Sequence, residues 1–147
     1  MPCSAHFAQQ RARILFNNES APSGNWKLAP LTIESSELDK LTEYNSDWEA
    51  FDPINIGNFT IVPYTAADPD ASEPIAEVLP YAYATNAPFY FTNSEDDNVV
   101  VKTLAVINTE GGTTYLYFWK AIAEQVIPKN DRLVVDTLKF ELSELGF

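Results

Sequence analysis

Residues 99–119 read VVVKTLAVINTEGGTTYLYFW. Two runs rich in β-branched and aromatic residues, which favour strands, lie on either side of Gly111 and Gly112. Glycine tolerates the positive φ that a tight reversal of the chain requires, so this pair is typical of a turn between antiparallel strands. The stretch therefore predicts a β-hairpin.

Residues 126–142 continue the pattern as VIPKNDRLVVDTLKFEL, after a short break that we expect beyond Trp119. The Pro-Lys-Asn-Asp stretch within it is typical of a turn. Near its end, Leu138, Phe140 and Leu142 alternate with charged residues, as in a strand that buries one face. Together with the hairpin, this segment predicts the C-terminal half of an antiparallel β-sandwich.

The composition extends this prediction to the whole chain of 147 residues. Hydrophobic residues make up 46% and aromatic residues 13%, which is enough to build a core without disulfides or metals. Ten prolines against five glycines indicate many short segments separated by breaks. We expect an all-β fold, an antiparallel β-sandwich with jelly-roll-like connections and room for one short helix.

The charge balance restricts the partners. Twenty-one acidic residues against nine basic ones give a formal net charge of −12 at pH 7. A negative net charge disfavours direct contact with nucleic acid or with an anionic membrane. It is consistent with a more basic protein neighbour, or with a charge that only keeps the protein soluble. No apolar run approaches the roughly 18 residues that span a bilayer, and we expect no secretory signal.

The chemistry-bearing residues do not form a recognisable catalytic or metal pattern. Cys3 and His6 are the only cysteine and histidine, so an intramolecular disulfide is excluded and a four-ligand zinc site lacks partners. A single cysteine suits folding in a reducing cytoplasm. There is no Gly-x-Ser-x-Gly elbow and no phosphate-binding glycine loop. We expect neither enzymatic activity nor a cofactor.

Two acidic segments resemble calcium-binding loops in part. Residues 68–73 read DPDASE, like the first half of a calcium loop. However, Glu73 stands where such a loop needs glycine, and Leu79 stands where it needs a bidentate glutamate. Residues 95–97 form a second acidic cluster. We expect both segments to be solvated loops and predict no metal site.

The N-terminal residues differ from the rest in charge. We expect residues 1–10 to form an extended arm and residues 11–147 to form a single β-sandwich domain whose first strand covers residues 11–16. Arg11 and Arg13 lie in a stretch without acidic residues. A basic arm on an acidic body predicts contact with a neighbouring subunit through these two arginines; the alternative is a frayed terminus.

The middle of the chain carries weaker signals. Ser36 opens a Ser-x-x-acid pattern that predicts a short helix over residues 37–45. Residues 54–62 alternate and predict one strand, with Gly57 as a possible bulge. Residues 66–74 are rich in Asp, Pro and Ser and predict a loop. Residues 26–33 predict an edge strand, because Pro30 interrupts them. Further short apolar segments before the hairpin are residues 75–83 and 89–91.

Aromatic residues crowd the second strand of the hairpin. Tyr115, Tyr117, Phe118 and Trp119 are too closely spaced for all their rings to point to one face. One face would meet the core and the other another subunit, which makes Tyr115, Tyr117 and Trp119 candidate interface residues. The alternatives are a carbohydrate-binding platform, or a sheet covered on both sides by loops of the same chain.

The C-terminal third also resembles small tail or capsid-surface proteins of tailed bacteriophages. These proteins end in an apolar strand, a Gly-Gly turn, an aromatic strand, an Asn/Gly-Asp turn and a final alternating strand. Asn130 stands where that family more often has glycine. The segments that carry the resemblance are Ala105-Val106-Ile107, Gly111-Gly112, Leu116-Tyr117-Phe118-Trp119, Val126-Ile127-Pro128-Lys129-Asn130-Asp131 and residues 138–142.

The resemblance implies a non-enzymatic virion structural protein that is made in the host cytoplasm and incorporated into the particle. It implies first a capsid decoration, or cement, subunit that bridges neighbouring capsid subunits. The alternative is a tail-associated or tail-fibre module that binds a host receptor or glycan. The implied partners are the major capsid protein or tail proteins, together with further copies of the chain in a small oligomer such as a trimer.

Overall fold

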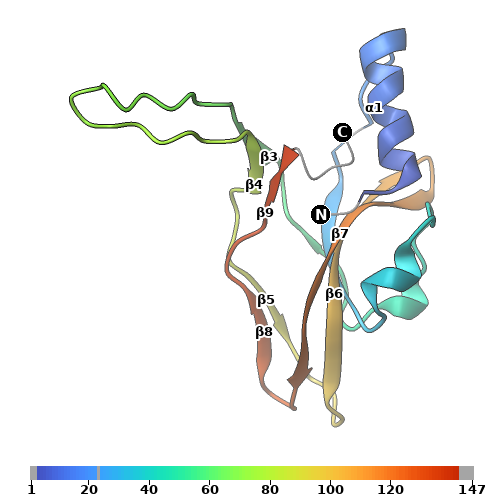
Figure 1. Cartoon of the computed structure of the whole chain (residues 1–147). Helices are drawn as coiled ribbons and strands as arrows, with labels where there is room; N and C mark the ends of the chain where they lie inside the picture. The colour runs from blue at the N-terminus through green and yellow to red at the C-terminus, as the bar shows by residue number, and fades with distance from the viewer. Residues whose placement is uncertain (1–2, 23, 143–147) are drawn as a thin grey trace.

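The computed structural model describes residues 3–22 and 24–142, which form two packed layers of antiparallel strands (Figure 1). The first layer is a four-stranded sheet in the order β2 (Ile54–Asn55), β1 (Trp26–Leu31), β6 (Val99–Glu110) and β7 (Thr113–Ile127). The second layer consists of β3 (Phe59–Val62), β4 (Tyr81–Ala84) and β9 (Lys139–Glu141), and of the pair β5 (Phe89–Thr92) and β8 (Arg132–Val135). The all-β, sandwich-like fold predicted from the sequence is confirmed. The edge position expected for residues 26–33 is wrong, because β1 pairs with β2 on one side and with β6 on the other.

The predicted hairpin is the longest strand pair of the molecule. β6 and β7 pair from Glu110 opposite Thr113 at the turn to Val99 opposite Ile127 at the far end. Gly111 and Gly112 have φ of 57° and 84°, values that a residue with a side chain adopts only with strain. The short break expected beyond Trp119 does not end the strand, because β7 continues to Ile127, but its register with β6 shifts between Ala121 and Gln125.

The main core lies between the two layers. It combines side chains of the four-stranded sheet, among them Val106 and Phe118, with side chains of the second layer, among them Phe91 and Phe140. The rings of Phe118 and Phe140 have centroids only 4.2 Å apart. The predicted alternation of the last strand is confirmed, since Leu138 and Phe140 are buried and Lys139 is exposed.

A second cluster covers the outer face of the four-stranded sheet. Trp119 belongs to it together with Leu31 and Leu38, and Trp48 packs against it. Two 3₁₀ turns supply the covering residues, η1 (Ser35–Leu38) and η2 (Ser46–Trp48). The helix expected over residues 37–45 is therefore wrong: a single turn ends at Leu38, and its buried leucine holds it on the sheet. Because both faces are covered, the strands read as nearly continuous apolar runs.

The N-terminal segment is a helix, α1 (Ala5–Asn17), so the extended arm expected over residues 1–10 and the strand expected over 11–16 are wrong for the residues described. Ser4 caps the helix by accepting the N–H of Phe7, and Asn18 ends it in the left-handed region. The physical reason lies in the composition of residues 5–15, where Ala, Gln, Arg and Leu favour a helix and glycine and proline are absent.

The strand expected over residues 54–62 is two strands in different sheets. Gly57 has a φ of +70°, and the chain changes direction there. β2 pairs with β1 in the first layer, whereas β3 pairs with β4 in the second. Ile56, fully buried between them, anchors the crossing. The position expected to be a bulge is thus a corner between the two layers.

Candidate functional site

The connection between β3 and β4 projects from the body as a long narrow loop, which we call the finger (residues 63–80; green to yellow-green in Figure 1). Two bridges hold its legs together: Thr65 with Val78, and Asp68 with Ile75. In each bridge both backbone N–H groups donate to the opposite carbonyl at 2.9 Å. The loop predicted over residues 66–74 is the outer part of this finger.

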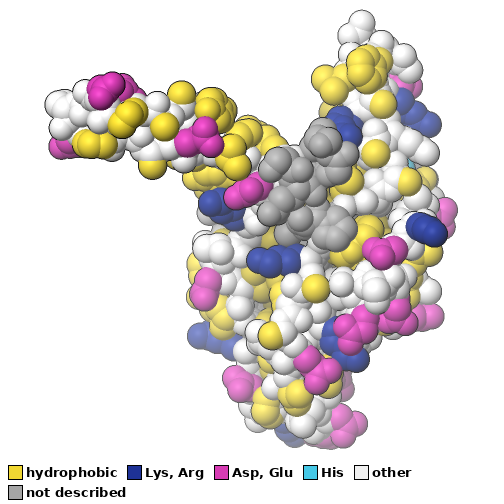
Figure 2. Space-filling view, viewed as in Figure 1, with side chains coloured by type: hydrophobic (Ala, Val, Ile, Leu, Met, Phe, Trp, Pro, Cys, Tyr) yellow, Lys and Arg dark blue, Asp and Glu magenta, His cyan; other side chains and the backbone are white. Residues whose placement is uncertain are grey.

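The finger combines exposed apolar and acidic side chains (Figure 2). Tyr64, Ile75 and Leu79 expose 54%, 46% and 46% of their surface, although they are large and apolar. The sequence of the finger contains no lysine or arginine. Its acidic residues are Asp68, Asp70, Glu73 and Glu77. Exposed apolar side chains that lie together on one projection are typical of a surface that contacts another protein, so the finger has the composition of a contact surface.

An apolar groove lies between α1 and the chain entering β1. Its volume is about 520 Å³. Leu15, which lines it, is 67% exposed, and the next residue, Phe16, is 83% exposed. Arg11 is the charged residue of the lining, and Arg13 is exposed on the same helix. The lining residues of α1 are Phe7, Gln10, Arg11, Ile14 and Leu15, and those beyond it are Ala21, Pro22, Gly24, Trp26, Asn58 and Tyr117.

Helix α1 is held against β7 by aromatic contacts. The imidazole of His6 stacks on the ring of Tyr115, with centroids 3.7 Å apart and planes 5° apart. Phe7 meets the edges of Tyr117 and Phe118 at 5.6 and 6.3 Å. At the start of the helix, the backbone N–H of Ser4 donates to the carbonyl of Tyr117 at 2.8 Å. The helix is therefore positioned as part of the body.

Glu110 is the polar centre of this contact. Its Oε1 lies 3.1 Å from His6 Nε2 and accepts from Gln10 Nε2 at 3.0 Å. Its Oε2 accepts from Asn108 Nδ2 at 3.1 Å and from the hydroxyl of Tyr117. Burial, followed by the hydrogen bond to Glu110, raises the pKa of Tyr117. These groups are engaged with one another, so the cluster fixes α1 in place.

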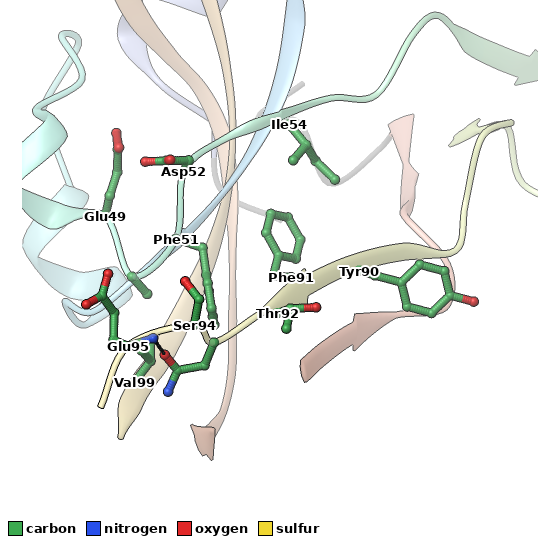
Figure 3. A pocket seen from close by; sticks show the side chains of 12 residues that line it. Glu49, Phe51, Asp52, Ile54, Tyr90, Phe91, Thr92, Ser94, Glu95 and Val99 are labelled. Carbon is green, nitrogen blue, oxygen red and sulfur yellow. Dashed lines mark hydrogen bonds between the residues drawn. The ribbon is translucent and has the colours of Figure 1, made fainter. Parts of the chain in front are cut away.

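A second cavity, of about 360 Å³, lies beside β5 (Figure 3). Phe91 points into it and packs on Phe51, with centroids 5.7 Å apart, while Tyr90 points away from the other side chains. Its polar lining residues are Glu49, Asp52, Thr92, Asn93, Ser94 and Glu95. Aromatic, hydroxyl and carboxylate groups of this kind suit a small polar ligand such as a sugar.

Asn93 builds the floor of that cavity. Its side chain is buried and donates to the carbonyls of Asp97 and Ile127, both at 2.9 Å. Its Oδ1 accepts the N–H of Glu95 at 2.9 Å, drawn as a dashed line in Figure 3. One side chain thus ties the turn after β5 to the end of β7. No feature of the sequence around Asn93 indicated this role.

The predicted interface residues divide into two groups. Tyr117 and Trp119 are 1% and 2% exposed, so their assignment to a contact with another subunit is wrong; α1 covers one ring and the 3₁₀ turns cover the other. This outcome matches the alternative of a sheet covered by its own chain. Tyr115 is partly buried beneath His6. Arg11 and Arg13 lie on α1, where Arg13 is exposed.

Within residues 3–22 and 24–142, no three His, Cys, Asp or Glu side chains lie close enough together to hold a metal ion. Cys3 pairs with Phe118 through a backbone bridge, and burial raises the pKa of its thiol. His6 is occupied with Tyr115 and Glu110. The acidic segment over residues 68–73 forms the tip of the finger.

Comparison with known proteins gives no relative: no protein-family model, no curated protein and no solved structure matches this chain significantly. None of the helices in the described part of the chain is both long enough and apolar enough to cross a bilayer.

Proposed function

We propose that this protein is a non-enzymatic structural subunit of a bacteriophage particle, and specifically a capsid decoration subunit that bridges neighbouring capsid subunits. The observation that carries the proposal is the finger, whose apolar side chains Tyr64, Ile75 and Leu79 are exposed on a projection outside the core. Its place in the virion is supported by the resemblance of the C-terminal strands to phage surface proteins.

A rigid body with a projecting contact element suits a bridging role. Each leg of the finger is about nine residues long, so at ~3.3 Å per residue it reaches at most about 30 Å from the sandwich. Helix α1 projects from the same end of the molecule in a different direction (Figure 1). A subunit that sits over a junction can therefore contact more than one neighbour while its sandwich stays unchanged.

The exposed apolar side chains supply the physical reason for binding. Burying apolar surface at an interface stabilises it by roughly 25 cal/mol per Å², before the cost of association is subtracted. Four acidic residues lie on the same finger as these apolar ones and keep the unbound subunit soluble. The major capsid protein is the partner that this arrangement suits first, with tail proteins second.

A second candidate function rests on the cavity beside β5. Its mixed lining of Phe91, Thr92 and the carboxylates of Glu49 and Glu95 suits a sugar, as expected of a tail-associated module that binds a host glycan or receptor. The aromatic strand β7 does not support this role, because Tyr117 and Trp119 are buried. Screening the purified protein against a glycan array separates this candidate from the first.

The proposal is tested by locating the protein on purified particles of the phage that encodes it, using electron microscopy. We expect density for the sandwich on the capsid surface with the finger against a capsid subunit. A matched variant replaces residues 66–77 with Asn-Gly, so that Thr65 and Val78 still face each other in the shortened hairpin. It should fold normally and show reduced occupancy, whereas the control Asn98→Ala should bind like wild type.

Absence of the protein from particles contradicts the proposal as a whole. Density confined to the tail, together with glycan binding, supports the second candidate instead. Full occupancy of the shortened variant shows that the finger is not the bridging element.

A further inference from the structure

We propose that the finger of one copy docks into the apolar groove along α1 of a second copy, so that the chain associates head to tail with itself. This inference rests on the proposed assembly function and names one of its contacts. The two surfaces lie on the same chain. The groove and its helix provide an apolar cavity with basic side chains, and the finger provides apolar and acidic side chains.

The groove is built to accept apolar side chains. Phe7 and Trp26 contribute aromatic walls, and Leu15 remains 67% exposed at the rim. Its volume of about 520 Å³ admits more than one side chain. Phe16 continues the apolar surface beyond the rim, with 83% of its surface exposed. A neighbour that covers this region would bury the most exposed apolar residues of the helix.

The finger offers side chains of the matching kind. Ile75 follows the tip, and Tyr64 and Leu79 lie nearer the base, so apolar groups are spaced along its length. The bridges between Thr65 and Val78 and between Asp68 and Ile75 fix the legs before any contact forms. A pre-ordered element loses less entropy on binding than a flexible loop does.

Charge complementarity identifies the second copy as the partner. α1 carries Arg11 and Arg13 and no acidic residue, whereas the finger carries four acidic residues and no basic one. The chain as a whole has a net charge of −12, so two copies repel each other over most of their surfaces. The helix is therefore a region of this acidic body where an acidic finger finds basic side chains close to apolar ones.

The geometry makes the contact heterologous. Figure 1 shows the finger and α1 leaving the body in different directions, so the finger of a copy does not lie in its own groove. The finger must enter the groove of a neighbour, whose own finger remains available for the next copy. Such contacts close into a ring or continue as a chain, according to the angle between neighbours.

The test is sedimentation velocity of the purified full chain over a range of concentrations. We expect wild type to form oligomers at low salt and to dissociate as salt screens the charges. Arg11→Glu, at the groove lining, and separately Asp68→Lys with Asp70→Lys, should each weaken association by about tenfold or more. Lys120→Glu changes the net charge by as much as Arg11→Glu, at an exposed position of β7, and serves as its matched control.

A mixing experiment makes the test directional. The Arg11→Glu chain keeps a native finger, and the Asp68→Lys/Asp70→Lys chain keeps a native groove. Mixed together, the two variants can form the native contact, and the reversed charges of the other finger and groove also complement each other. Association that is weak in each variant alone should therefore be restored in the mixture.

Three results would overturn the inference: a wild-type chain that stays monomeric at every concentration, association that neither charge reversal changes, or association that depends on only one of the two surfaces. The last result would mean that the groove or the finger has another occupant. Particle binding is measured separately. A monomer that still binds particles refutes the self-contact and leaves the proposed function standing. An oligomer that binds no particle supports the self-contact and refutes the proposed function.

Discussion

His6 and Tyr115 lie face to face, with ring centroids 3.7 Å apart and planes 5° from parallel. One ring belongs to the first turn of α1 and the other to β7, so the single histidine of the chain joins its N-terminal helix to its central hairpin. The same imidazole lies 3.1 Å from Glu110 Oε1. This contact gives the helix a fixed orientation on the sandwich.

Replacing His6 with alanine should therefore loosen α1. We expect the free energy of unfolding to fall by about 1–2 kcal/mol, from the lost ring stacking and the lost hydrogen bond to a carboxylate. Urea denaturation measures this change, and hydrogen exchange should show faster exchange in α1 than in β6. Gln9→Ala, at an exposed position of the same helix, is the control. Equal stability of the two variants would mean that the stack contributes nothing.

Stability should also fall at alkaline pH. Burial raises the pKa of Tyr117 and of Tyr44, and hydrogen bonds to Glu110 and Glu49 raise both further. These phenols hold their protons more tightly when folded, so their contribution is complete below the unfolded-state pKa of about 10 and is lost as pH rises above it.

We expect unfolding free energies measured by urea denaturation to fall between pH 10 and 11. Tyr117→Phe and Tyr44→Phe should each reduce that pH dependence, whereas Tyr90→Phe, at an exposed position, should leave it unchanged. A pH dependence that survives both substitutions would assign it to other groups.

Asn93→Ala should be among the more damaging polar substitutions in the second layer. It removes three hydrogen bonds of a side chain that is 1% exposed and leaves the carbonyl of Ile127 without this donor. Unpaired buried polar groups cost about 1–3 kcal/mol each, so we expect a total loss of about 3 kcal/mol. Thermal and urea denaturation measure it against Asn98→Ala. A loss within the range of that exposed control would refute the role assigned to Asn93.

Thermal stability should not respond to chelators. The described part of the chain brings no three metal-ligating side chains together, and Asp68 and Asp70 lie at the exposed tip of the finger. We expect the same melting temperature in EDTA, in calcium and in neither. A melting temperature that falls in EDTA and returns with calcium would show that residues 68–73 bind the ion.

The sequence alone determined the parts of the fold that depend on neighbouring residues. Gly111 and Gly112 specify a reversal by their conformational freedom, and the alternation at residues 138–142 specifies which side chains of the last strand face inward. Composition and turn spacing were sufficient for the antiparallel sandwich. The sequence also showed that residues 68–73 are acidic, but it did not predict that they lie at the tip of a projecting finger.

Only the tertiary structure decided where those segments meet. The Ile-Leu-Phe run at residues 14–16 is typical of a strand, but in the structure it belongs to a helix that Phe7 and His6 hold against β7. Tyr117 and Trp119 could not be assigned to core or surface, because the elements that cover them are distant in sequence. The finger and the groove also depend on contacts between segments that are separated in the sequence. Strand and turn preferences act between near neighbours in the chain, whereas burial and surface shape depend on contacts between distant segments, which local patterns do not encode.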